Sequence, residues 1–267
     1  MPGCLKIEDV HVRFEAGTVN ENHVLKGISF EAEAGDFITV IGGNGAGKST
    51  LLNTIAGVFV ADEGSIAIDE IDVTRMVEHK RAGLIGRIFQ DPRMGTATRM
   101  TIEENLAIAT CRGLNRGLRF GLRAEDREFF REQIKQLDLG LEDKLTKDIG
   151  LTSGGQRQAI TLLMATIATP KLLLLDEHTA ALDPKTAEQV LLLTKKIVEE
   201  KQLTTFMVTH NMQSALRFGN RLIMLHNGQI VVDLKGKEKE IATMEDLLQL
   251  FKLNSRIEFE DDGVLLA

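Results

Sequence analysis

The residues best suited to chemistry form one glycine-rich stretch, which reads Gly42, Gly43, Asn44, Gly45, Ala46, Gly47, Lys48, Ser49 and Thr50. An apolar run over residues 36–41 predicts a buried strand before it, and a helical pattern over residues 50–56 follows it. Strand, glycine loop and helix in this order are typical of a phosphate-binding loop, because backbone N–H groups and the helix N-terminus face the phosphate oxygens. We predict that the stretch binds phosphate groups, that Lys48 bridges the outer phosphates and that the Ser49 hydroxyl ligates Mg²⁺. The alternative is a tight turn that binds nothing.

Two acidic residues follow a run of four leucines at residues 172–175. Consecutive leucines predict a strand buried on both faces, as in a parallel sheet. Such a strand ends at the edge of the sheet where a phosphate loop also lies. We therefore predict that Asp176 holds Mg²⁺, directly or through water, and that Glu177 accepts a proton from an attacking water. The alternative is a pair of acidic residues at a strand exit.

Two further polar residues are predicted at strand ends. Gln90 follows a short strand over residues 83–89, and its amide oxygen can ligate Mg²⁺ and sense the γ-phosphate. Taken alone, it would be an ordinary polar loop residue. His210 follows a buried strand over residues 204–209 and can bond the γ-phosphate and orient the glutamate and the water. A lone histidine elsewhere would be structural.

A second anion site is predicted where Ser153, Gly154, Gly155 and Gln156 open a helix that continues through residues 157–168. Free N–H groups, a hydroxyl donor and the helix dipole favour an anion there, whereas in isolation the stretch is only a helix N-cap with flexible glycines. Phe14 ends the first predicted strand, residues 5–14. Its ring either stacks on adenine or is a core or rim phenylalanine, and the sequence favours neither.

The composition limits the class of protein. The chain has 267 residues, 43% hydrophobic, and a formal net charge of −7 from 39 acidic and 32 basic residues. An acidic chain is a poor non-specific binder of nucleic acid, so no nucleic-acid partner is expected. Cys4 and Cys111 show no metal-type spacing and fit a reducing cytoplasm. The longest apolar-rich region, residues 159–175, is broken by Pro170, so any membrane role is expected to come through a partner.

A region of helical pattern extends from residue 100 to about residue 140. A capping box of Thr101 and Glu104 predicts the start of its first helix. The apolar face of a later helix is predicted to comprise Phe129, Phe130, Ile134 and Leu137. Between them, six arginines recur three or four residues apart, at Arg112, Arg116, Arg119, Arg123, Arg127 and Arg131. A basic stripe would contact lipid headgroups or an acidic partner, but interrupting glycines favour a solvated face.

The C-terminal part carries no catalytic pattern. Thr243 and Asp246 form a second capping box, which predicts a helix there. Its apolar face is predicted to comprise Met244, Leu247, Leu248 and Phe251. We interpret this part as a packing helix followed by an acidic tail.

The order of these motifs resembles one family, the ATP-binding cassette (ABC) ATPases. The resemblance covers residues 5–235 and comprises the phosphate loop, Gln90, the signature Ser153–Gln156, the acidic strand 172–177, the loop 181–183 with Asp183, and His210. It implies an α/β P-loop NTPase (RecA-like) fold with a parallel-sheet core, an antiparallel β subdomain and a helical subdomain inserted at about residues 91–160. On this basis residues 1–235 form the nucleotide-binding domain, and residues 236–267 form a C-terminal helix and tail.

The resemblance also implies a mechanism. Two copies would face head to tail, with each ATP between the phosphate loop of one copy and the signature of the other, and Asp183 beside it. Gln90 and the helical segment after it would pass the motion to a transmembrane permease, which holds the chain at the cytoplasmic side of the membrane. Two positions depart from the family pattern. Thr152 replaces a usual leucine, for which we expect a packing change, and His178 replaces a usual proline, which we interpret as a variant loop residue.

Four segments, residues 17–22, 42–53, 162–166 and 176–184, resemble more closely the ATP-binding subunits of bacterial tryptophan/tyrosine-type importers, which work with a permease and a lipid-anchored binding protein. The expected function is thus import of an amino acid or a similar small solute. An exporter or lipoprotein-release ATPase is the alternative with the same chemistry. A soluble ABC protein acting on ribosomes or DNA is disfavoured by the single cassette, the absence of a heptad run and the acidic balance.

Overall fold

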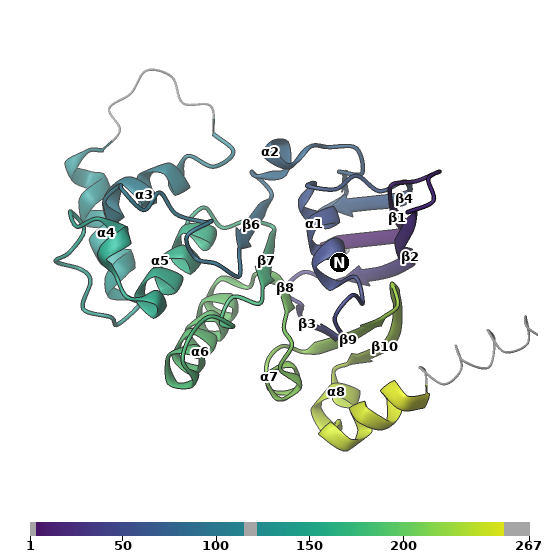
Figure 1. The fold of residues 1–267 in the computed structure, drawn as a ribbon. Coiled ribbons are helices and arrows are strands. Elements are labelled where there is room, and N and C mark those ends of the chain that lie inside the picture. The colour runs from purple at the N-terminus through teal and green to yellow at the C-terminus, as the bar shows by residue number, and fades with distance from the viewer. Residues whose placement is uncertain (1–3, 115–121, 254–267) are drawn as a thin grey trace, which may run out of the picture. The chain divides into compact units, whose positions relative to one another are not determined.

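The computed structural model describes residues 4–114 and 122–253, and these form two compact units (Figure 1). The first unit contains residues 1–77 and 206–267, and the second contains residues 78–205. Each unit is described by itself. None of the helices within the described ranges is long and apolar enough to cross a membrane.

The first unit combines an antiparallel sheet with the strands that carry the phosphate loop. The antiparallel sheet has the order β2-β1-β4-β5, and the other strands follow the order β10-β9-β3-β8. Strand β3 pairs in parallel with β9, and β9 pairs antiparallel with β10. The elements are β1 (Leu5–Phe14), β2 (Asn22–Ala32), β3 (Phe37–Gly42), α1 (Lys48–Ala56), β4 (Glu63–Ile68), β5 (Ile71–Asp72), β8 (Thr204–Val208, which begins at the boundary), α7 (Met212–Arg217), β9 (Arg221–His226), β10 (Gln229–Lys235), α8 (Lys237–Ile241) and a helix over residues 244–253.

The second unit packs helices around one parallel strand pair, in which Ile88 of β6 lies opposite Leu175 of β7. Helix α5 packs against both α3 and α6. Its elements are α2 (Glu78–Arg81), β6 (Ile85–Ile88), α3 (Ile102–Thr110), α4 (Ala124–Lys135), the 3-10 turn η1 (Ile149–Leu151), α5 (Gly154–Thr166), β7 (Leu172–Asp176) and α6 (Pro184–Lys201).

Most elements lie where the sequence pattern predicts them. The first strand has the predicted bounds, the four leucines of β7 are fully buried, and α1 ends at Gly57 in the left-handed conformation. Both capping boxes are confirmed, since Thr101 and Glu104 bond each other reciprocally, as do Thr243 and Asp246. Helix α5 begins at Gly154, within the stretch predicted to open it, whereas α1 begins at Lys48, two residues earlier than predicted, because Lys48 and Ser49 of the phosphate loop enter its first turn.

Two predicted core positions are wrong. Phe129 is 41% exposed although Phe130 and Ile134 are buried, because one residue along a helix turns the side chain by about 100° away from the packed face. Leu248 is 40% exposed for the same reason, since its neighbour Leu247 takes the buried position. The apolar face of the C-terminal helix is therefore narrower than its sequence suggested.

Candidate functional site

The phosphate loop lies between the buried strand β3 and helix α1 in the first unit. Gly42, Gly45 and Gly47 all have positive φ angles, so the loop needs glycine to turn back on itself. The ammonium of Lys48, only 8% exposed, donates hydrogen bonds to Gly42 O at 2.9 Å and Gly43 O at 3.0 Å. The loop thus holds a positive charge at its own centre, where the N-terminus of α1 adds partial positive charge.

The surroundings of the loop fit a phosphate chain. On the inner side the loop is tightly backed, because a Cβ at Gly42 would collide with the Leu225 carbonyl oxygen and one at Gly47 would lie 2.9 Å from Leu25. On the outer side, a Cβ at Gly43 or Gly45 would have no other atom within 4 Å. A positively charged loop that is packed against the protein on one side and open on the other is suited to binding the phosphates of ATP.

His210 and Phe14 belong to the same unit. The backbone N–H of Thr209 donates to Val40 O at 3.0 Å, so His210 follows directly after a residue bonded to the strand that enters the phosphate loop. Phe14 is half-buried at the end of β1, and its ring meets the Phe59 ring edge-on with centroids 5.1 Å apart. The first unit therefore brings the predicted histidine to the phosphate-loop edge of the strands.

We expect Phe14→Ala to weaken nucleotide binding by roughly tenfold, because a base–aromatic stack contributes about 1–3 kcal/mol. Titration of a fluorescent ATP analogue measures the dissociation constant. Phe129→Ala is the matched control, since it removes a ring that is likewise partly exposed. An affinity equal to that of the control would make Phe14 a rim residue that only packs on Phe59.

The second unit brings together the other strand-end residues. Because Ile88 pairs with Leu175, Gln90 and Glu177 each lie two residues beyond the same point of the parallel pair. Glu177 has φ +43°, a left-handed conformation that is uncommon for this residue type. Strained backbone conformations of this kind cluster at functional sites. Carboxylate and amide oxygens are ligands that Mg²⁺ accepts, so Asp176 and Gln90 fit the predicted metal role.

The donor set is sparse, as Mg²⁺ sites with phosphate ligands generally are. Over residues 4–114 and 122–253 no group of three or more His, Cys, Asp or Glu side chains could hold a metal by itself. One carboxylate and one amide within this unit, completed by phosphates and water, remain compatible with this finding.

The signature stretch starts α5 with a complete capping box. Ser153 Oγ accepts a hydrogen bond from the Gln156 N–H at 3.3 Å, and Gln156 Oε1 accepts one from the Ser153 N–H at 3.2 Å. The serine hydroxyl is exposed and keeps its own proton for another acceptor. Beside it lies a cavity of about 260 Å³, lined by Ser153, Gly155 and Gln156 on one side and by Thr186 of α6 on the other.

Gly155 and Asp183 are linked through Thr186. A Cβ at Gly155 would collide with the Thr186 methyl group, so only glycine lets α5 approach α6 this closely. The Asp183 carboxylate caps α6 by accepting from the Thr186 N–H at 3.1 Å. Hydrogen bonding to the Thr186 side chain, and then to its backbone, lowers the pKa of Asp183. The signature and the loop before α6 are thus joined within this unit.

One residue of this region was not predicted from the sequence. Arg157 donates to Gly150 O at 2.8 Å and to Thr152 O at 3.1 Å, and so holds the turn that leads into Ser153. The sequence held one sign of this role: an arginine near the start of a helix is unusual, because the helix dipole disfavours positive charge there. Thr152 itself donates its hydroxyl proton to Ile149 O at 2.7 Å, while Leu151 is 80% exposed. The expected packing change is therefore a polar turn at this position.

His178 lies in the loop after β7 but is buried, with only 3% exposed. Its Nε2 is 3.2 Å from the Thr194 hydroxyl, which donates its proton to Val190 O at 2.8 Å, so we assign Nε2–H as the donor. Burial lowers the pKa of His178 to about 4, which keeps the ring neutral at pH 7. It is a packing residue, away from the chemistry that the neighbouring Glu177 could perform.

This pKa predicts acid sensitivity. The folded state takes up the His178 proton near pH 4, and the unfolded chain takes it up near pH 6.5, so unfolding binds protons between these values. The free energy of unfolding therefore falls as the pH drops from 6.5 to 4, by up to about 3 kcal/mol. Urea unfolding at pH 7 and pH 4.5 measures the loss, which should be smaller in His178→Gln. The exposed His79→Gln is the control, and equal losses in all three proteins would contradict the assignment.

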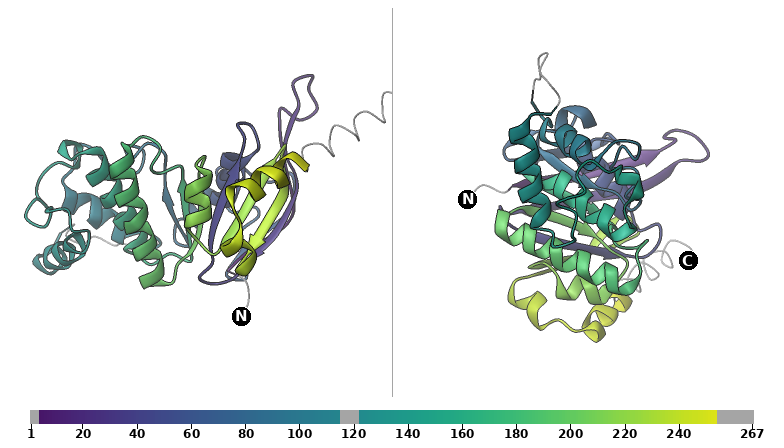
Figure 2. Two further views of the ribbon diagram at one scale, coloured as in Figure 1. Left: turned by 90° about the horizontal axis from the view of Figure 1, so that it is seen from below. Right: turned by 90° about the vertical axis from the view of Figure 1, so that its left-hand side faces the viewer.

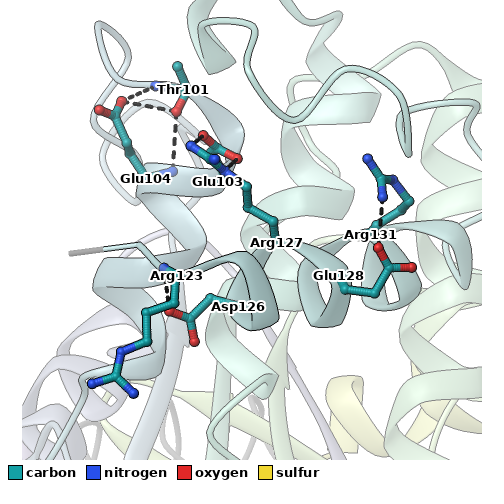
Figure 3. A network of polar contacts seen from close by, with 8 residues as sticks. All are labelled: Thr101, Glu103, Glu104, Arg123, Asp126, Arg127, Glu128 and Arg131. Atoms are coloured by element: carbon teal, nitrogen blue, oxygen red, sulfur yellow. Dashed lines mark hydrogen bonds and ion pairs between the residues drawn. The ribbon is translucent and has the colours of Figure 1, made fainter. Parts of the chain in front are cut away.

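The described arginines do not form one basic face. Arg127 makes a bidentate pair with the buried Glu103, at 3.0 and 3.1 Å, and Arg131 pairs with Glu128 at 2.8 Å (Figure 3). The Arg112 guanidinium points inward to Ala165 O at 3.4 Å. Helix α3 ends at Thr110 and α4 begins at Ala124, so no continuous helix carries the stripe within the described residues. Arg116 and Arg119 lie outside the described residues.

Comparisons with known proteins agree with this geometry. The sequence matches the ABC transporter family over residues 25–180. It is 44% identical to a tyrosine transport ATP-binding protein of Clostridioides difficile (strain R20291), over 93% of this chain and 98% of that protein. It is 33% identical to a thiamine import ATP-binding protein of Photorhabdus laumondii, over 86% and 89% of the two chains.

Two solved structures share the fold. The dimeric post-hydrolysis state of the ATP-binding cassette MJ0796, bound to ADP and Pi, aligns with a TM-score of 0.73 at 31% identity, covering 86% of this chain and 98% of that chain. The ADP conformation of MJ1267, another cassette of an ABC transporter, aligns with a TM-score of 0.76 at 25% identity, covering 94% and 99%. The fold is thus that of a P-loop ATPase cassette. The chain belongs to the ABC transporter family, as an ATP-binding subunit with ATPase activity.

Proposed function

We propose that the chain energises the import of an aromatic amino acid, as a head-to-tail dimer bound to the cytoplasmic side of a separate transmembrane permease. The observation that carries the substrate class is the 44% identity to a tyrosine transport ATP-binding protein over nearly the whole of both chains. An extracytoplasmic binding protein would deliver the solute to the permease. In this proposal residues 1–235 are the nucleotide-binding domain with a helical insertion at about 91–160, and residues 236–267 are a C-terminal extension.

The proposed roles follow from the chemistry of each side chain. Lys48 neutralises charge on the outer phosphates, and Glu177 accepts the proton of the attacking water. His210 bonds the γ-phosphate and orients Glu177 and the water. Gln90 senses the γ-phosphate and transmits its loss to the permease. Mg²⁺, held by Ser49, Gln90 and Asp176, would supply electrostatic stabilisation of the transferring phosphoryl group.

The head-to-tail dimer is supported by the chain having two different helix N-termini that are suited to binding an anion. The phosphate loop opens α1 in the first unit, and the signature opens α5 in the second. The exposed serine hydroxyl at the second terminus is available to donate to the γ-phosphate on the partner copy. The related cassette MJ0796 has been solved as a dimer.

A pull-down from detergent-solubilised native membranes tests this proposal. The tagged chain should co-purify with a polytopic permease and a binding lipoprotein, and the purified lipoprotein should bind tyrosine or tryptophan but not thiamine. The same tag on an unrelated soluble protein is the control. Ribosomal proteins or DNA in place of a permease would overturn transport. A permease recovered without any binding protein would favour the exporter or lipoprotein-release alternative.

A further inference from the structure

The short helix after His210 is held at three points within the first unit. At its start, the Asn211 side chain caps α7 by accepting from the Ser214 N–H at 2.9 Å. In its middle, the buried hydroxyl of Thr39 on β3 donates to Ala215 O at 2.9 Å. At its end, the Lys239 ammonium donates to Phe218 O, and to Gly219 O at 2.7 Å. Two of these contacts come from elements adjoining the site, and the third comes from the C-terminal part of the chain.

Lys239 is unusual because it is a lysine with only 3% of its surface exposed. Burial lowers the pKa of Lys239 to about 8, because the charged form is held away from water. In return it satisfies two carbonyl oxygens that lie beyond the last turn of α7, where no helical N–H can reach them. Burying an ammonium costs free energy, and the hydrogen bonds to these two carbonyl oxygens offset part of that cost.

Apolar contacts also connect α7 to the C-terminal helix. Leu247 of the C-terminal helix and Ala215 of α7 are both fully buried in one core cluster, which also contains Ile41 of β3. Met212 and Leu216 of α7 pack against this cluster, as do Leu250 and Phe251. Figures 1 and 2 show the C-terminal helices beside the β9–β10 pair. Helix α7 is therefore clamped between the strand that enters the phosphate loop and residues 236–253.

The turn at the end of α7 is also fixed to β3. Asn220 Oδ1 accepts from the Phe37 N–H at 2.8 Å, and the Gly236 N–H donates to Asn220 O at 3.0 Å. Gly219 has φ +74°, and a Cβ there would collide with the Phe37 carbonyl oxygen, so the turn has little freedom to rearrange. Helix α7 therefore connects the turn that Lys239 binds to Asn211 and His210.

We propose that residues 236–253 form a brace that sets the position of His210 through α7, with Lys239 as its positioning residue. This rests on the proposed role of His210 at the γ-phosphate. None of the brace residues is assigned to nucleotide binding, so we expect the brace to act on hydrolysis and to leave nucleotide affinity to the phosphate loop. It gives the C-terminal part a function beyond covering apolar surface.

The test compares Lys239→Met with Lys237→Met, which removes a charge of the same kind from an exposed position of the same helix. We expect Lys239→Met to lower kcat about tenfold, since a displacement of a fraction of an ångström at a catalytic group is enough. The Kd for ATP should stay within about twofold of wild type, because Lys48 and its loop are untouched. Lys237→Met should match wild type in both measurements.

Melting temperatures of all variants report folding, and Lys239→Gln, which keeps a donor, serves if Lys239→Met does not fold. A kcat equal to that of Lys237→Met in a folded Lys239 variant would overturn the brace. So would a loss of ATP affinity as large as the loss in kcat. His210→Ala separates the two proposals. If His210→Ala is inactive while the Lys239 variants are normal, only the brace fails. If His210→Ala hydrolyses ATP normally, the proposed role of His210 fails and the brace falls with it.

Discussion

Glu177→Gln should lower ATP hydrolysis by about 10²–10⁴-fold, the usual contribution of a general base. The amide has nearly the same shape as the carboxylate but cannot take a proton from water. The backbone conformation at Glu177 should also survive the substitution. Glu177 is the first residue after β7 and is held at φ +43°, and its carbonyl accepts from the Ala180 N–H at 2.9 Å. The substitution changes neither of these features, so the loop should keep its conformation.

Binding and hydrolysis should separate in this variant. Glu177→Gln should bind ATP within a few-fold of wild type, because no phosphate contact is assigned to the carboxylate. It should then accumulate as an ATP-bound dimer, which light scattering after gel filtration with and without ATP would detect. Phosphate release measured in parallel gives the rate.

Glu199→Gln is the matched control. Glu199 lies on the exposed face of α6, where it is paired only loosely with Lys195 at 3.8 Å. An exposed pair of this kind contributes little to stability, so this control should hydrolyse ATP at the wild-type rate and remain monomeric or dimeric as wild type does. Wild-type turnover in Glu177→Gln would remove Glu177 from the base role. Another proton acceptor near the γ-phosphate would then have to be the base.

The sequence places each candidate site residue at a strand end or a helix start, because the patterns that mark these elements are local. Strand, glycine loop and helix around Lys48 are local patterns, and so are the four leucines before Asp176. In a parallel arrangement, residues that follow adjacent strands emerge at one edge, which is why Gln90 and Glu177 lie at the same end of the pair β6–β7. Such inferences need only the type and direction of each element.

Contacts between distant segments were beyond the reach of the sequence. The partner of His178 is Thr194, sixteen positions away, and nothing in the loop sequence marks that histidine as buried. Lys239 stands in the charged run Lys237 to Glu240, which is typical of a solvated helix, yet its ammonium is buried against Phe218 and Gly219. Periodicity indicates which face is apolar, but tertiary packing decides which charged side chain is enclosed.

Lys48→Met should cause the largest loss of nucleotide binding. The ammonium is nearly buried and bonds two carbonyl oxygens of its own loop, so its charge is fixed where the outer phosphates are expected. A charge-assisted hydrogen bond contributes about 1.5–3 kcal/mol, and losing contacts to both phosphates should weaken ATP affinity by roughly 10²-fold or more. Methionine keeps the length and packing of the side chain, so the change is mainly one of charge.

Affinities for AMP, ADP and ATP distinguish binding of the phosphates by Lys48 from a role in which Lys48 only holds the loop together. If Lys48 meets the outer phosphates, Lys48→Met should weaken ATP and ADP strongly and AMP only slightly, whereas Phe14→Ala should weaken all three alike. Lys6→Met removes a charge from an exposed residue of the same unit, paired with Glu8 at 2.6 Å, and should leave all three affinities unchanged. Equal losses for AMP and ATP in Lys48→Met would mean that the ammonium only holds the loop together, through Gly42 and Gly43. The gradient from AMP to ATP is therefore the quantity that assigns the charge to the phosphates.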